Sequence, residues 1–206
     1  NYSTIIAKSD DVTNGTEDGS LAFNTMKAGS LTETMRLTSG LVGIGTATPS
    51  SLLSLNGVDG NTTLGLFAHS SLHLHNTTAV NSYSQITFGY DTGRTNAAAV
   101  IGYKNESSTA YGKGALVFAT RDDTNDVAST ERMRISSAGN VGIGVSPDTN
   151  MHIHKATAGS VDSNANAQLT IENNTHAGIQ FLSPNDANNI IYFGDVNDNN
   201  VSYLAY

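Results

Sequence analysis

The chain has 206 residues, of which only 14% are charged and 38% are hydrophobic, and its formal net charge is −8. An acidic chain whose ten lysines and arginines are scattered is a poor partner for nucleic acid or for an anionic membrane surface. The absence of cysteine excludes disulfides, cysteine-ligated zinc and thiol catalysis, and no apolar run approaches the roughly 20 residues of a membrane-spanning helix.

Short β-strands are the elements that the sequence predicts from its first residues onward. No window of helical length places apolar residues at i, i+3, i+4 and i+7, whereas apolar and polar residues alternate in short runs between Gly, Asn, Asp and Ser turns. We therefore expect an all-β fold with almost no α-helix.

Residues 1–25 begin a long internal repeat. The segment "NYSTIIAKSDDVTNGTEDGSLAFNT" aligns without a gap onto "NAAAVIGYKNESSTAYGKGALVFAT", which places Ile6 on Ile101 and Phe23 on Phe118. A repeated pattern favours an architectural role over a catalytic one.

The next predicted strand, "TETMRL", recurs as "TERMRI", so that Glu33 matches Glu131 and Arg36 matches Arg134. Strict alternation along a strand places the glutamate and this arginine on opposite faces. We therefore expect any pairing between them to come from another strand or another subunit, with two separate surface charges as the alternative.

Two glycine motifs follow these strands. "GLVGIGTATPSSLLSLNG" (Gly40–Gly57) repeats the layout of "GNVGIGVSPDTNMHIHKA" (Gly139–Ala156). A dinucleotide-binding loop needs a third glycine where Pro147 stands, and the Gly-Lys-Ser/Thr of a phosphate-binding loop is absent. We interpret the glycines as a tight turn between strands, where glycine allows a positive φ or close backbone packing, and we expect no cofactor.

Two pairs of histidines, His73/His75 and His152/His154, have the spacing that presents both imidazoles to one face of a strand. In a threefold assembly, six such nitrogens would suit an axial metal ion. The first repeat has serine and asparagine in place of His152 and His154, so we expect this pair to face solvent. We assign no metal site, and keep an axial metal as the alternative, chiefly for His73/His75.

Aspartates gather in two predicted turns. A glycan-cleaving enzyme would need two carboxylates held about 5–10 Å apart beside a sugar groove. Asp- and Asn-rich loops between strands are usually solvated turns and occasionally calcium sites, and the chain has no Trp. We therefore expect no enzyme and no catalytic residue among the candidates Asp122, Asp123, Asp126, Asp195 and Asp198.

The repeat divides the chain into two β-repeat units, residues 1–95 and 96–206, the first beginning and the second ending in mid-repeat. We expect the polypeptide to continue, with a third "VGIG" beyond Tyr206. Each predicted strand has one thin apolar stripe, so a lone chain would leave sheet faces and strand edges uncovered. Stacking of the repeats and wrapping around copies of itself would cover both, which predicts a homo-oligomer.

The segments "STERMRISSAGNVGIGVSPDTNMHIHKA" and "LTETMRLTSGLVGIGTATPSSLLSLNG" resemble the recurring segment of tail-fibre proteins of tailed bacteriophages, especially those of marine and cyanobacterial hosts. "GALVFATRDD" and "SQITFGYDTGRTNAAAVIGYK" fit the same pattern, so the resemblance touches most of the chain. One departure is that the second motif, ending at Pro147, lacks one residue of the Thr-x-x-Pro spacing of Thr46–Pro49.

The resemblance implies an elongated fibre shaft of short strands, similar to a β-helix or β-prism, intertwined in a homotrimer. It implies a structural virion protein of the tail fibre, with itself, other tail or fibre proteins and a host-surface glycan or protein receptor as partners. We expect the loops "NSYSQ" (81–85) and "NDNNVSY" (197–203) to touch glycans. The alternatives are a tailspike-like polysaccharide depolymerase and a bacterial surface adhesin built from the same repeat.

Overall fold

Every regular element in the computed structural model is a β-strand, over the described residues 2–56, 72–75, 79–89, 93–109, 112–160, 162–196, 198–199 and 201–205. The predicted all-β class is thus confirmed. The chain forms two compact units, Asn1–His75 and Asn76–Tyr206. These boundaries differ from those of the repeat units 1–95 and 96–206, which follow the period of the sequence repeat.

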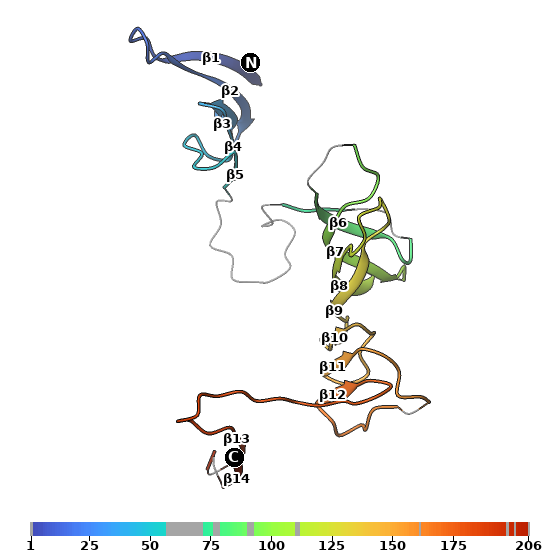
Figure 1. Cartoon of the computed structure of the whole chain (residues 1–206). Helices are drawn as coiled ribbons and strands as arrows, with labels where there is room; N and C mark the ends of the chain where they lie inside the picture. The colour runs from blue at the N-terminus through green and yellow to red at the C-terminus, as the bar shows by residue number, and fades with distance from the viewer. Residues whose placement is uncertain are drawn as a thin grey trace. The chain divides into compact units, whose positions relative to one another are not determined.

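The first unit is a single sheet whose strands follow one another in chain order (Figure 1). Neighbouring strands are antiparallel except for the last pair, which is parallel. The strands are β1 (Ser3–Asp11), β2 (Asp18–Lys27), β3 (Ser30–Thr38), β4 (Leu41–Ile44) and β5 (Leu53–Leu55).

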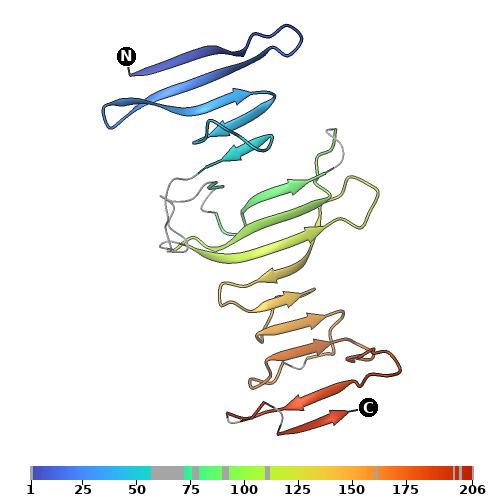
Figure 2. The same cartoon turned by 90° about the vertical axis from the view of Figure 1, so that its left-hand side faces the viewer.

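The second unit contains a seven-stranded sheet that also keeps chain order, and Figure 2 shows its strands as successive rungs. The pairs β10–β11 and β11–β12 are parallel and the others antiparallel. The strands are β6 (Tyr83–Phe88), β7 (Ala99–Ser107), β8 (Lys113–Thr120), β9 (Thr130–Ile135), β10 (Val141–Ile143), β11 (Met151–His154) and β12 (Leu169–Glu172). A separate hairpin joins β13 (Ile190–Phe193) to β14 (Ser202–Ala205).

The repeat is preserved in the pairing, because β1 to β5 and β7 to β11 have the same order and strand directions. One alignment prediction is wrong. Ile5 pairs with Phe23, and Ile101 pairs with Phe118, so Ile5 rather than Ile6 is the counterpart of Ile101. The β1–β2 hairpin is one residue longer than the β7–β8 hairpin, which a gapless alignment cannot accommodate.

A β-bulge recurs in both units and corrects a second prediction. Phe23 pairs with Met35 but the next residue pairs with Glu33, so Thr34 is an extra residue in β3; Arg132 is the extra residue in β9. A bulge shifts the alternation of side chains by one residue. Glutamate and arginine three positions apart consequently share a face, and the prediction that they point to opposite faces is wrong.

The resulting ion pairs lie within one strand. Arg36 Nε and Nη2 donate to the two carboxylate oxygens of Glu33 at 2.8 and 2.6 Å. Arg134 Nε and Nη2 donate likewise to Glu131 at 2.5 and 2.9 Å, and Arg134 Nη1 also donates to Glu106 at 3.2 Å. Such paired, parallel hydrogen bonds are the strong form of the arginine–carboxylate contact.

The core is small. Among the described residues the buried apolar side chains are those of Ala22, Ala115 and Val117. Ala22 pairs with Arg36, and Val117 pairs with Arg134, so these side chains lie on the face that carries the ion pairs. The opposite face of each sheet contains none of them.

Candidate functional site

Residues paired across strands share a face. The face opposite the ion pairs has apolar residues on every strand of the five-stranded and the seven-stranded sheet. In the first unit it consists of two rows, Ile5–Phe23–Met35–Ile44–Leu55 and Ala7–Leu21–Leu37–Val42–Leu53. In the second it consists of the rows Ile86–Ile101–Phe118–Met133–Ile143–Ile153–Ile171 and Ser84–Tyr103–Leu116–Ile135–Val141–Met151–Leu169. We call these rows the apolar face of each unit.

The apolar face is substantially exposed. Ile5 keeps 69% of its surface in solvent and Leu53 keeps 57%, and in the second unit Leu169 keeps 45%. Contiguous exposed apolar surface of this kind marks an interaction surface in soluble proteins.

The other face of each sheet, which we call the loop-covered face, is crossed by the chain as it returns to start a parallel strand. A Cβ on Gly142 would collide with the Val145 carbonyl and lie 2.7 Å from Pro147 Cδ. Gly43 is equally crowded, with Thr46 O at 2.5 Å from such a Cβ. The second glycine of each motif, Gly144, or Gly45 in the first unit, has a positive φ, 76° and 74° respectively. The interpretation of these glycines as a tight turn is confirmed.

His152 is not solvent-facing as predicted, but only 4% exposed. Its Nε2 lies 3.1 Å from Glu172 Oε2, and its Nδ1 lies 2.9 Å from Asp148 Oδ1, although without the alignment of a hydrogen bond. His154 Nε2 is 3.8 Å from the same Glu172 oxygen. The imidazole of His152 thus sits between two carboxylates from the loop before β11 and from β12.

The two carboxylates are also bound to backbone. The amide of Ala158 donates to Glu172 at 2.6 Å, and this hydrogen bond is the main reason why the pKa of Glu172 lies below its ordinary value. Partial burial acts to raise the pKa of Asp148, but hydrogen bonds from Ser163, a backbone hydrogen bond at Asp148 itself and the nearby His152 together lower it. His152 and its partners therefore fasten loops to the sheet.

No group of three or more His, Asp or Glu side chains able to hold a metal ion occurs in the described part of the chain. The rings of His73 and His75 have centroids 6.2 Å apart, and both residues are exposed. An axial metal at this pair remains a prediction.

The aspartates of the 121–129 loop stabilise turns. Asp126 accepts the backbone N–H groups of Thr95 and Asn96 at 2.7 and 3.0 Å, the first being the main cause of its lowered pKa, and it pairs with Arg121 at 3.2 Å. Asp122 pairs with Arg132 at 2.8 Å.

The remaining turn acids hold backbone amides. Asp123 accepts the N–H of Asn125, and Asp195 accepts the N–H of Asp198. The predicted turn positions agree with these contacts.

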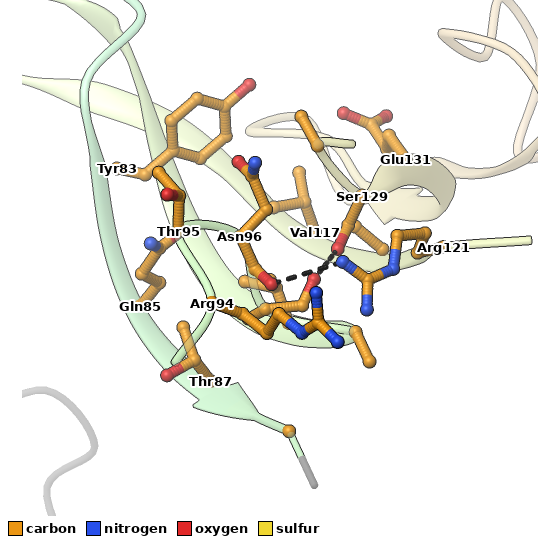
Figure 3. Close-up of a pocket in the computed structure, with 16 residues that line it drawn as sticks. Tyr83, Gln85, Thr87, Arg94, Thr95, Asn96, Val117, Arg121, Ser129 and Glu131 are labelled. Atoms are coloured by element: carbon orange, nitrogen blue, oxygen red, sulfur yellow. Dashed lines mark hydrogen bonds between the residues drawn. The ribbon is translucent and has the colours of Figure 1, made fainter. Parts of the chain in front are cut away.

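A hollow of about 560 Å³ lies on the loop-covered face of the second unit, over β6, β7 and β8 (Figure 3). Strand β6 contributes Tyr83, Gln85 and Thr87, and the loops before β7 and after β8 contribute Arg94 and Arg121. The segment "NSYSQ" was predicted to be a loop, but its residues Tyr83 and Gln85 lie in strand β6. The sequence gave no signal for the arginines, which come from segments on either side of β7 and β8.

No helix in the described residues is long and apolar enough to cross a membrane. No protein-family model matches the sequence, and no curated protein is significantly similar to it.

Proposed function

We propose that this chain is a structural segment of a bacteriophage tail fibre, a homotrimeric β-rich shaft that positions or forms the receptor-binding apparatus for adsorption. Its partners would be two further copies of itself, other tail or fibre proteins, and a glycan or protein on the host surface. Its location would be the virion tail. The observation that carries the proposal is the exposed apolar face present in both units.

Covering that face is strongly favourable. Full burial of one Leu, Ile, Phe or Met side chain stabilises by about 1.5–3 kcal/mol, and each face has two rows of such residues. The face alone would suit two sheets packed together or three sheets packed around an axis. The resemblance of the "ERMRI" and "VGIG" segments to tail fibres favours three.

The loop-covered face fits this arrangement. With the apolar faces directed inward, the ion pairs and returning loops of all three chains would remain in solvent. The same face recurs in each unit, so each unit would pack around a threefold axis in the same way. A shaft of this kind acts by reach and multivalency, because three identical weak sites on one stalk raise avidity without any single tight contact.

Electron microscopy of the purified chain tests the proposal. We expect thin particles with threefold symmetry in class averages. Particles with twofold symmetry, or single chains with no common axis, would contradict the proposed fibre. Incubation with surface polysaccharides is expected to release no oligosaccharide, and release of fragments would favour the depolymerase alternative instead.

A further inference from the structure

We propose that residues 178–182 form a strand on the edge of β13 that β14 does not occupy, and that the three-stranded sheet so formed is a third self-association surface of the chain. The partner of this surface would be a further copy of the same chain, and that part of the inference rests on the proposed function. The strand itself needs one chain only.

The hairpin of β13 and β14 repeats the hairpin of β7 and β8 pair for pair. Tyr192 pairs with Tyr203 as Ile101 pairs with Phe118, and the other pairs of the shorter hairpin follow in the same order. Ile101 and Phe118 belong to the apolar face of the second unit. The rings of Tyr192 and Tyr203, whose centroids lie 6.3 Å apart, therefore occupy the position of that face in a further copy of the repeat.

The further copy lacks one strand that the earlier copy has. Strand β6 pairs with one edge of β7, whereas no described strand pairs with the corresponding edge of β13. A two-stranded hairpin alone is marginally stable in water, and three strands with an apolar face are needed for a stable sheet. An open edge also presents unpaired N–H and C=O groups to another strand. The edge of β13 is thus a site for one more strand.

A matching segment lies ahead of β13 in the chain. "AGIQFLS" (177–183) repeats "SQITFGY" (84–90), so that Ile179 corresponds to Ile86 and Phe181 to Phe88. Ile179 and Phe181 are 62% and 49% exposed. The backbone of residues 177–182 makes no hydrogen bond within the described part of the chain. Exposed apolar residues at alternate positions and an unpaired backbone are the properties of a strand that has not joined a sheet.

A turn between this segment and β13 favours pairing within one chain. The Ala187 N–H donates to the Pro184 carbonyl at 3.1 Å, and the Ser183 hydroxyl donates to the Ala187 carbonyl at 3.1 Å. A hydrogen bond between residues three apart closes a β-turn, which reverses the direction of the chain. Reversal of the chain is what an antiparallel pair of neighbouring strands requires.

The register of β6 on β7 predicts how the new strand pairs. Transfer of that register places Ile179 opposite Tyr192, and Gln180 opposite Ile191 on the other face. The resulting row Ile179–Tyr192–Tyr203 is the counterpart of the β6–β7–β8 part of the apolar face. Exposed in one chain, such a row would be covered by further copies in the way proposed for the two larger sheets.

Paired cysteines test the strand, because the chain contains no cysteine of its own. Oxidation of the Gln180→Cys/Ile191→Cys variant is expected to form a disulfide within one chain, detected by mass spectrometry of the non-reduced protein. The matched control is Gln180→Cys/Phe193→Cys, in which the second cysteine is displaced by two residues on the same face. It should oxidise at least about tenfold more slowly, because the two Cα atoms are then too far apart. Equal rates, no disulfide, or a disulfide between chains would each overturn the strand.

Hydrogen exchange measures the strand independently in the unchanged chain. Amides of residues 178–182 that pair with β13 should exchange about tenfold or more slowly than in the unfolded chain. Exchange of the whole segment at the rate of the unfolded chain would contradict the strand.

Two neighbouring residues of β13 test the self-association surface. Tyr192 and Phe193 are 56% and 51% exposed, but they point to opposite faces of the strand. Tyr192→Gln is expected to weaken self-association about tenfold, because an apolar contact between copies is lost. Phe193→Gln is the control and should leave it unchanged. Sedimentation at several concentrations gives the dissociation constants, and equal values for both variants would overturn the third surface.

Failure of this inference is distinguishable from failure of the fibre function. A threefold particle whose Gln180→Cys/Ile191→Cys variant does not oxidise would refute the additional strand and leave the shaft intact. A monomeric chain whose variant oxidises as expected would refute the shaft and the third surface, and keep the strand.

Discussion

Two acids hold Arg134 of the "ERMRI" strand in place. Arg134 has 12% of its side chain exposed, and contacts Glu131 on its own strand and Glu106 on β7. The hydrogen bonds that Arg134 donates to Glu131 raise the pKa of its guanidinium above the ordinary value. Its removal would leave two part-buried carboxylates without their main partner.

Arg134→Ala should therefore lower the stability of the second unit by about 1–3 kcal/mol. The midpoint of urea unfolding at fixed protein concentration measures it. Arg132→Ala, which breaks an exposed pair with Asp122, should change stability by less than about 0.5 kcal/mol. Equal midpoints for the two variants would show that the bulge-assisted pair contributes nothing.

Glu172 gives the second unit a dependence on acid pH. Its pKa is lowered from an ordinary 4.5, chiefly by the Ala158 amide and then by His152. A lowered pKa contributes stability that is fully present above pH 4.5 and is lost as the pH falls through the folded-state value. Asp148, also lowered, acts in the same direction.

Glu172→Gln should consequently destabilise the chain more at pH 6 than at pH 3. The urea midpoints of the two proteins, compared at both pH values, test this sign. A difference that is the same at pH 6 and pH 3 would mean that the carboxylate charge is not responsible.

The sequence predicted the identity of the matched charges but not their geometry. Strict alternation of side chains would place Glu131 and Arg134 on opposite faces, and no feature of the sequence indicates that Arg132 is an extra residue in the strand. His152 was predicted to face solvent because the first repeat has Ser54 in its place, and its partner Glu172 lies on the next strand, which the sequence does not indicate. Contacts of this kind depend on strand pairing, which local patterns do not determine.

At the scale of elements, the glycine motif lets the chain turn back over its own sheet. Gly142 pairs with Arg134 on one side and His152 on the other, and Val145 and Pro147 lie against its backbone. Any side chain at this position would push the returning loop away from the sheet.

Gly142→Ala should cost about 1–3 kcal/mol, because the added methyl group overpacks a backbone contact. Gly178→Ala is the matched control, since nothing lies within 4 Å of its Cβ position. Thermal unfolding followed by circular dichroism compares them. Equal melting temperatures would contradict the crowding at Gly142.

The repeat and its glycine-rich turns predicted an all-β chain of short strands, whereas the order of the strands in the sheets was not predicted. The parallel pairing of β4 with β5 and of β10 with β11 was not predicted, since a short connection between two apolar runs usually joins antiparallel strands. The predicted alignment of β1 with β7 was wrong by one residue because the first hairpin is one residue longer. Ile101 was therefore matched with Ile6 and not with Ile5.

At the scale of the whole molecule, the thin apolar stripes predicted for single strands combine into one apolar face per unit. In a lone chain the exposed members of this face would tolerate polar substitution, whereas in an assembly they would be buried against other copies. A polar substitution on this face therefore distinguishes a lone chain from an assembly.

Leu116→Gln should weaken self-association more than tenfold, because each copy loses an apolar contact worth roughly 1.5–3 kcal/mol on full burial. Val127→Gln is the control, since Val127 is 44% exposed against 41% for Leu116 but lies in a loop away from the apolar rows. Sedimentation at several concentrations gives the dissociation constants. Identical values for both variants would remove the apolar face from the interface.

The molar mass of the unchanged chain in solution, measured by multi-angle light scattering at micromolar concentration, tests the central claim most directly. The account predicts three times the chain mass of 21.5 kDa, held over a tenfold dilution. A mass equal to that of one chain would contradict it, because the apolar faces of both units would then stand in water.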